Sequence, residues 1–150
     1  MVDIVSAETR SRMMSNIRAR NTSPELQVRR ALHAAKLRFR LHRKDLPGRP
    51  DIVLARWNVV IFVNGCFWHW HDCSAGRIPD TRREFWIAKL SANRKRDNIK
   101  KNELLSSGWR VLTVWECALK GRARNPLFAS EAVDFIKSNS SAADITGRPF

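Results

Sequence analysis

The sequence contains no tyrosine and only three cysteines in 150 residues. No apolar run approaches the roughly 20 residues that cross a bilayer, and the N-terminus lacks the apolar core of a signal peptide. We therefore expect a cytoplasmic protein that does not enter a membrane. An odd number of cysteines argues against a secreted disulfide framework, and clustered Cys and His in a reducing compartment more often bind metal.

Acidic residues are also scarce, with 14 Asp and Glu against 28 Lys and Arg, which gives a net charge of +14. This excess predicts a polyanionic partner, although a merely soluble basic surface is the alternative. The six tryptophans favour nucleic acid, because indole rings stack on bases.

The apolar periodicity predicts helices over about residues 8–17, 23–35, 81–107 and 126–137, and strands over 37–41, 51–55, 59–63 and 109–115. We expect the first three strands to form an antiparallel meander. A capping-box match at Thr81 to Glu84 marks the start of the third helix, and its polar stretch predicts a break near Leu90. The order predicts an α/β (mixed α+β) domain with a central mixed sheet flanked by helices.

Residues 1–137 are predicted to form one domain with an N-terminal arm over residues 1–20. The segment 138–150 is rich in Ser, Ala, Gly and Pro and is predicted to be disordered. Glu25 lies at a helix start, where either Thr22 caps the helix with Glu25 or Ser23 caps it with Pro24 in the first turn. On sequence alone, Glu25 is interpreted as a capping residue.

Potential metal ligands crowd the segment after the strand at 59–63. Cys66, His69, His71 and Cys73 fall within eight residues, and Cys117 follows another strand. Three thiolates and one imidazole would close a tetrahedral Zn²⁺ site, and a site without an open position is structural. The alternative is a set of unligated surface histidines and buried thiols.

Two further residues are candidates for hydrolytic chemistry. Asp51 begins a strand that returns as a hairpin, as in many metal-dependent nucleases, although an Asp after Gly-Arg-Pro is otherwise an ordinary turn residue. His69 is left over from the zinc set and could accept a proton from water. It could instead be a structural histidine, or exchange roles with His71. His33 and His42 have no partners in the sequence and are interpreted as surface or core residues.

Three aromatic residues, Phe67, Trp68 and Trp86, have no evident place in a core. Apolar wedges between base steps kink a duplex, whereas the alternative for each ring is ordinary packing.

Four segments together carry a family resemblance: Gly-Arg-Pro-Asp51, Phe-Val-Asn-Gly-Cys-Phe-Trp-His-Trp-His-Asp-Cys73, Thr-Arg-Arg-Glu-Phe-Trp86 and Gly-Trp-Arg-Val-Leu-Thr-Val-Trp-Glu-Cys117. They resemble the very short patch repair (Vsr) DNA mismatch endonucleases, and the similarity runs from about Thr9 to Gly121. The resemblance implies a restriction-endonuclease-like core. It also implies a Mg²⁺-dependent enzyme that nicks one strand of duplex DNA beside a T:G mismatch, the product of 5-methylcytosine deamination.

The resemblance also implies roles for individual residues. Asp51 and the carbonyl of Val63 would bind Mg²⁺, His69 would be the general base, and Glu25 and Asn64 would line the same site. The remaining implied residues are the Zn²⁺ ligands Cys66, His71, Cys73 and Cys117, the DNA wedges Met14, Phe67, Trp68 and Trp86, and the base-reading positions Lys89 and Asn93.

Two positions depart from typical family members, which carry Thr and His where this chain has Val63 and Asn64. A backbone carbonyl survives the change to Val63, but Asn64 cannot carry a proton. We expect a nucleoid-associated bacterial monomer, with mismatch-repair accessory proteins as further partners. The rivals are a non-catalytic zinc-containing DNA-binding module, which would not need Asp51 and His69 near one another, and a restriction-type endonuclease that cuts both strands.

Overall fold

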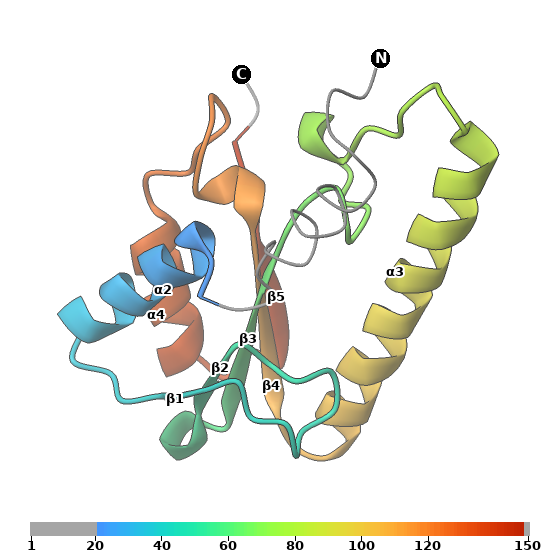
Figure 1. Ribbon diagram of the computed structural model, residues 1–150. Coiled ribbons are helices and arrows are strands. Elements are labelled where there is room, and N and C mark those ends of the chain that lie inside the picture. The colour runs from blue at the N-terminus through green and yellow to red at the C-terminus, as the bar shows by residue number, and fades with distance from the viewer. Residues whose placement is uncertain (1–20, 149–150) are drawn as a thin grey trace.

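In the computed structural model, which describes residues 21–148, a five-stranded sheet lies between two layers of helices (Figure 1). The elements are α2 (Ser23–Ala34), β1 (Arg40–Leu41), β2 (Ile52–Leu54), β3 (Val59–Asn64), α3 (Arg83–Ser106), β4 (Arg110–Trp115), α4 (Phe128–Lys137) and β5 (Ala142–Ile145). The helix expected over residues 8–17 lies outside the described residues. Among residues 21–148, no helix combines the length and apolar character needed to cross a membrane.

The sheet is mixed, with the strand order β1-β2-β3-β4-β5. The pairs β1–β2 and β2–β3 are antiparallel, which confirms the predicted meander, while β3–β4 and β4–β5 are parallel. In the β3–β4 register, Asn64 pairs with Trp115. The segments that follow these two strands therefore leave the sheet at the same edge, which brings Cys66 and Cys117 together.

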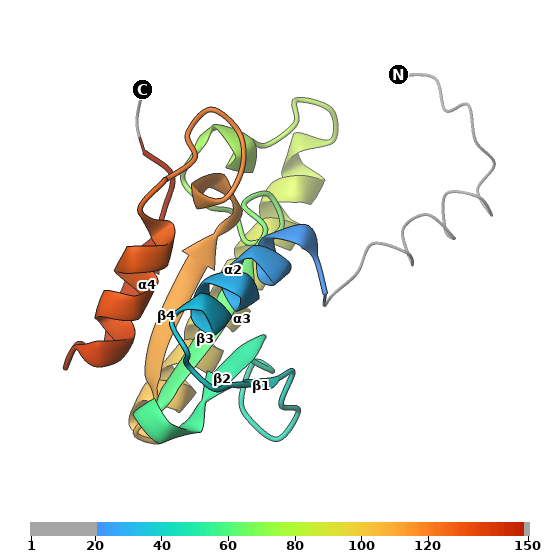
Figure 2. The same cartoon turned by 90° about the vertical axis from the view of Figure 1, so that its left-hand side faces the viewer.

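Each face of the sheet has its own apolar cluster, because side chains alternate along a strand. Ile61 and Leu112 belong to the larger cluster, which α2 and α4 cover (Figures 1 and 2). Val60 and Val111 pack on the opposite face against Leu104 near the end of α3. The basic helix α3 thus contacts the sheet through its C-terminal part and leaves polar side chains free to line a site.

The helix α3 corrects two predictions. It runs unbroken for 24 residues, so the break expected near Leu90 is wrong. The stretch from Asn93 to Asn98 contains neither Gly nor Pro, and its polarity marks a face toward the cleft described below rather than a helix end. The capping box at Thr81 does not form, since the N-cap is Arg82 with φ 55° and no side-chain capping bond.

The C-terminal segment corrects a third prediction. Residues 138–148 are ordered, and Ala142–Ile145 forms the edge strand β5. The segment contains little apolar surface, but the free edge of β4 supplies backbone partners and Ile145 is buried. Composition alone misses a strand of this kind, because its order comes from main-chain pairing rather than from a core of its own.

Candidate active site and metal centre

A cleft of about 1550 Å³ is lined by β3, β4, the residues that lead into β2, and the polar face of α3. Asp51, Asn64 and Thr113 line it from the sheet. His69 and Asp97 line it from the loop after β3 and from α3. The cleft therefore brings together Asp51 and His69, the two residues that a non-catalytic module would not need near one another.

Asp51 lies immediately before β2, and its Oδ2 accepts a hydrogen bond of 2.8 Å from the backbone N–H of Val63. Burial, with a smaller contribution from the nearby Glu25 carboxylate, raises the pKa of the Asp51 carboxyl to about 7, although the hydrogen bond from the Val63 N–H opposes the shift. Without a cation, this carboxyl holds its proton to a much higher pH than an exposed aspartate does. A buried carboxylate of this kind is suited to binding a cation, because a positive charge restores its ionised form.

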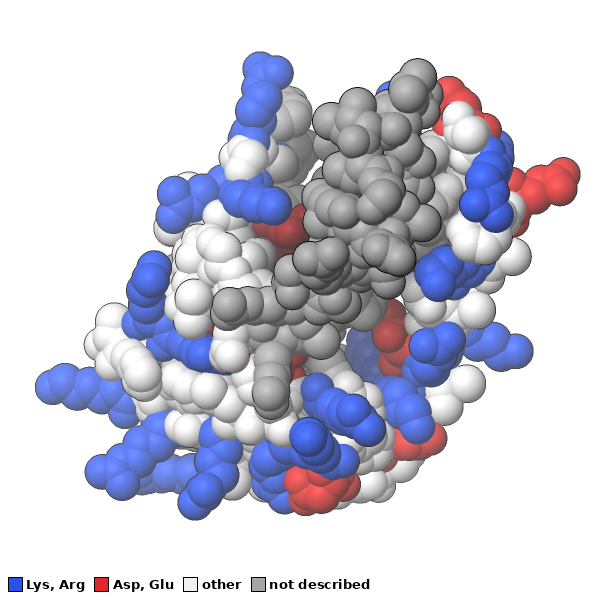
Figure 3. All heavy atoms as spheres, in the orientation of Figure 1, with Lys and Arg blue, Asp and Glu red and all other residues white. Residues whose placement is uncertain are grey.

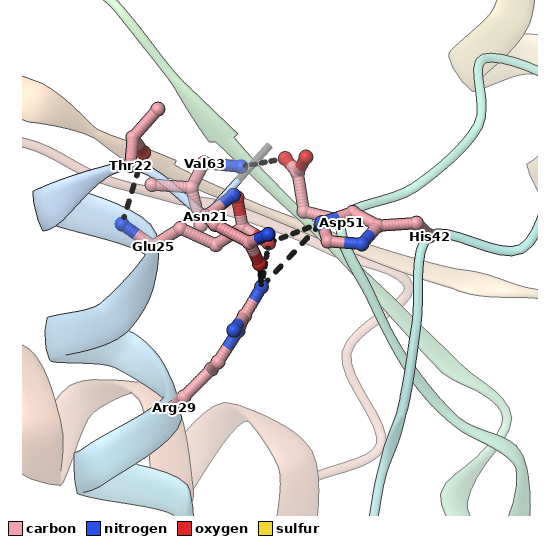
Figure 4. Close-up of polar contacts among 7 residues, drawn as sticks. All are labelled: Asn21, Thr22, Glu25, Arg29, His42, Asp51 and Val63. Atoms are coloured by element: carbon pink, nitrogen blue, oxygen red, sulfur yellow. Dashed lines mark hydrogen bonds and ion pairs between the residues drawn. The ribbon is translucent and has the colours of Figure 1, made fainter. Parts of the chain in front are cut away.

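Glu25 is almost fully buried, with 1% of its surface exposed, and all of its oxygen atoms are engaged (Figure 4). Its Oε1 lies 2.5 Å from both Arg29 and His42, and its Oε2 accepts from the backbone N–H of Asn21 at 2.8 Å. Thr22 caps α2 by accepting from the Glu25 N–H at 3.3 Å, so the first of the two predicted caps is confirmed. The interpretation of Glu25 as only a capping residue is incomplete.

One ligand atom from each of Glu25, His42 and Asp51 lies within 4.8 Å of the other two. Two carboxylates and an imidazole are a donor set that could hold a divalent cation. The sequence alone did not identify His42 as a potential metal ligand, although the expected hairpin places it near Asp51. Because Leu41 pairs with Ile52, the hairpin register sets His42 against Asp51, and the His42 N–H donates to the Asp51 carbonyl at 3.1 Å.

His69 is held from the opposite wall of the cleft. Its Nδ1 lies 2.6 Å from Asp97 Oδ2 on α3, and the side chain is 32% exposed. The carboxylate fixes the ring orientation and leaves Nε2 free to take a proton. Asp97 was also missed, and no local pattern could have found it, because it lies 28 residues from His69 on a helix that was predicted to break.

The chain between the cleft and the Cys/His cluster is tied to α3 on both sides of His69. Asn93, predicted to read bases, donates from its side-chain amide to the Trp68 carbonyl at 3.1 Å. The guanidinium of Arg94 donates to the Trp70 carbonyl and lies 4.6 Å from the centroid of the Trp70 ring. Trp70 has φ 49°, a left-handed conformation that is rare for a bulky residue.

Cys66, His71, Cys73 and Cys117 form a second potential metal site, with one ligand atom of each within 4.8 Å of the others. These are the four residues expected to bind zinc, and three sulfurs and a nitrogen fit a tetrahedral Zn²⁺ centre. Burial lowers the pKa of His71, which favours the neutral imidazole needed for ligation, and raises the pKa of the Cys66 and Cys117 thiols. The backbone N–H of Cys117 donates to Cys66 Sγ at 3.3 Å, and that of Gly147 donates to Cys117 Sγ at 3.2 Å.

Gly76 allows the loop to close around this cluster. A Cβ at position 76 would overlap the carbonyl oxygen of His71 and lie 3.2 Å from that of Cys66. We expect Gly76→Ala to lower the melting temperature by about 5–10 °C and to reduce the bound zinc well below one ion per chain. The measurements are calorimetry and metal analysis on purified protein.

Gly65→Ala is the matched control, because a Cβ there would meet only Trp68 Cδ1 at an ordinary 3.8 Å. Equal zinc content and equal melting temperature in the two variants would show that the close approach of the backbone at Gly76 is not needed to form the cluster.

The three aromatic residues predicted to wedge into DNA lie together. Phe67 and Trp68 come from the loop after β3 and Trp86 from the first turn of α3, with ring centroids 5.1 to 6.1 Å apart. Phe85, which is 44% exposed, adds an edge contact to Trp86. Lys89 and Asn93 follow one turn apart on the same helix. Met14 lies outside the described residues.

Basic side chains line the cleft that contains Asp51. Among residues 21–148 they are Lys44, Arg49, Arg94, Arg96, Lys100 and Lys101. Figure 3 shows Lys and Arg spread over the face of Figure 1, including the side formed by α3. A positively charged rim around an acidic pocket can bind a phosphate backbone while leaving carboxylates for a cation at the centre.

Comparison with known proteins places these features in a family. The family model described as "DNA mismatch endonuclease Vsr" matches residues 2–75. The chain is 49% identical to the Type II nicking enzyme V.XorIIP of Xanthomonas oryzae pv. oryzae over 133 residues, 85% of this chain and 98% of that protein. It is 44% identical to the DNA mismatch endonuclease Vsr of Escherichia coli K12 over 124 residues, 83% of this chain and 80% of that protein. It is 41% identical to the Type II nicking enzyme V.NmeAIP of Neisseria meningitidis, over 82% of this chain and 88% of that protein.

Proposed function

Because the chain belongs to the Vsr family of DNA mismatch endonucleases, we propose that it nicks one strand of duplex DNA beside a T:G mismatch left by deamination of 5-methylcytosine. The observation that carries the proposal is the cleft that contains both Asp51 and His69, whose imidazole is hydrogen-bonded to the Asp97 carboxylate. The enzyme would act in the bacterial cytoplasm as a monomer, with mismatch-repair proteins as accessory partners.

The catalytic cation would be Mg²⁺, which Asp51 and the Val63 carbonyl would hold, with Glu25 close by. The donor set is supported by the proximity of the Glu25, His42 and Asp51 ligand atoms and by the raised pKa of Asp51. When bound, Mg²⁺ polarises the scissile phosphate and stabilises the leaving oxygen. Arg29 already neutralises part of the charge on Glu25, so Asp51 is the principal protein ligand.

His69 takes the proton from the attacking water. Its Nδ1 is bonded to Asp97, so Nε2 is the atom that receives the proton, and the Asp97 carboxylate stabilises the imidazolium that forms. Asn64 lines the same cleft and can hydrogen-bond a water or a phosphate oxygen, but it cannot accept that proton.

Recognition of the mismatch uses the aromatic group of Phe67, Trp68 and Trp86, together with Met14 from the N-terminal arm. A T:G pair stacks less well than a Watson–Crick pair, so less free energy is needed to insert a wedge beside it. Lys89 and Asn93 contact the mismatched bases. Asn93 already donates one amide N–H to the Trp68 carbonyl, and its second N–H and its Oδ1 can contact a base, which links recognition to the loop that carries His69.

The names of two relatives, Type II nicking enzymes, leave the preferred sequence context open. The test is a set of otherwise identical duplexes that carry each mismatch in several flanking contexts, incubated with zinc-loaded protein and Mg²⁺. We expect one strand of the T:G duplex to be cut and the matched duplex to stay intact. Cleavage of both strands would favour a restriction-type endonuclease, and binding without any cleavage would favour a non-catalytic module.

A further inference from the structure

Two histidines separated by one residue serve two different centres. The His69 ring contacts Asp97 in the cleft, whereas His71 Nδ1 lies 3.6 Å from Cys117 Sγ in the metal cluster, and its ring stacks 4.1 Å from Trp115. The backbone turns between them: residues 66–70 form turns, in which the Trp70 N–H donates to the Phe67 carbonyl at 3.1 Å and the His71 N–H donates to the Cys66 carbonyl at 2.8 Å. Trp70 completes this turn with the left-handed φ of 49°.

Arg94 holds this turn from outside. Its guanidinium donates a hydrogen bond to the Trp70 carbonyl and stacks over the Trp70 ring. One side chain therefore contacts both the backbone and the indole of the residue at which the chain turns. The preceding helical residue, Asn93, holds the Trp68 carbonyl. The peptide carbonyls on both sides of His69 are thus fixed by consecutive residues of α3, one turn before Asp97.

We propose that Arg94 is a positioning residue that keeps the left-handed turn at Trp70 closed, so that His69 points into the cleft while His71 stays in the metal cluster. The proposal rests on the proposed role of His69 as the base. It differs from the simpler role suggested by charge, in which Arg94 is one more cation on the rim of the cleft and contacts only phosphate.

The test compares Arg94→Met with Lys95→Met in zinc-loaded protein. Both changes remove one positive charge from α3, and Lys95 is exposed and does not line the cleft. Small displacements of a catalytic group cost on the order of 10²-fold in rate, so we expect that loss in the single-turnover nicking rate of Arg94→Met at saturating DNA. The DNA dissociation constant should change no more than in Lys95→Met. A loss of affinity with an unchanged saturating rate would assign Arg94 to phosphate binding and overturn the proposal.

One further measurement separates this inference from the proposed function. The chain has four histidines, so the ring nitrogens of each can be followed by NMR without any substrate. Arg94→Met should shift the His69 signals and leave those of His71 in place. Unchanged His69 signals would overturn the proposal even if the enzyme is active, while a shift in a protein that nicks no duplex would leave the positioning role intact and remove the proposed activity.

A second substitution tests whether Arg94 acts through the turn itself. Glycine adopts the left-handed conformation readily. Adding Trp70→Gly to Arg94→Met should therefore recover at least threefold of the lost nicking rate. A double variant no faster than Arg94→Met alone would show that Arg94 does not work by holding Trp70, and would overturn the mechanism that we propose.

Discussion

Asp51→Asn is expected to abolish nicking of the T:G duplex, with a rate loss larger than the about 10³-fold that follows removal of one oxyanion-hole donor. The amide keeps the size of the side chain and can still accept the Val63 N–H bond, but it brings no negative charge to a cation. Duplex binding should stay within about threefold of wild type, because the basic rim is untouched. The measurements are single-turnover nicking and equilibrium binding on the same duplex. Nicking by this variant at near the wild-type rate would remove Asp51 from the mechanism.

The same variant should lose a pH dependence of stability. Burial raises the pKa of Asp51 to about 7 from its ordinary value of 3.8, so the folded protein retains a proton that the unfolded chain releases between about pH 4 and 7. The magnesium-free protein should therefore lose stability as pH rises through that window, and show no further loss from this group above it. Asp51→Asn should remove this component of the slope, and added Mg²⁺ should flatten it in wild type, because the cation binds the ionised form. An identical slope in both proteins would show that Asp51 is not the group responsible.

His69→Ala is expected to slow single-turnover nicking by about 10²–10⁴-fold, the usual contribution of a general base. Asn64→Ala should cost much less, because water can replace its hydrogen bond to a phosphate or a nucleophile. Asn64→His should be tolerated and could raise the rate. All three variants would be compared at saturating Mg²⁺ and saturating DNA.

His33→Ala is the control for removing an imidazole, since His33 is exposed and stacks on Phe39 rather than lining the cleft. It should nick at the wild-type rate. The assignment of the base is wrong if His69→Ala behaves like this control, or if Asn64→Ala is the more damaging change.

The parts of the molecule that follow local patterns could be predicted from the sequence. The strands at 51–55, 59–63 and 109–115 are short apolar runs, and the structure has a strand in each of these ranges. The cluster of potential zinc ligands was predicted from the ligand types, three cysteines and a histidine, and from the family resemblance. That β3 and β4 are neighbours in the sheet, which brings Cys117 to the loop that carries Cys66, is a finding of the structure.

The contacts that orient the site could not be predicted in the same way. Asp97 reaches His69 across 28 residues and Arg94 reaches Trp70 across 24, and both depend on how an unbroken α3 lies against the loop. Residues of this helix carry no local signal, because a solvated basic helix has the same composition. The strand β5 was missed for a related reason, since it is stabilised by a partner strand rather than by its own apolar residues.

The parallel pairing of β3 and β4 gives the Cys/His cluster a consequence beyond the geometry of its ligands. Cys66 and Cys117 are 51 positions apart, and the chain between them contains the whole of α3. A metal ion bound by both would act as a cross-link that closes this long loop. In the chain-entropy description, a covalent cross-link over such a loop stabilises the folded state by about 4 kcal/mol. The basic helix α3 buries only Leu90 and Leu104 and contacts the loop through Asn93, Arg94 and Asp97, so the closure of that loop by a metal ion would add to the few contacts that hold it.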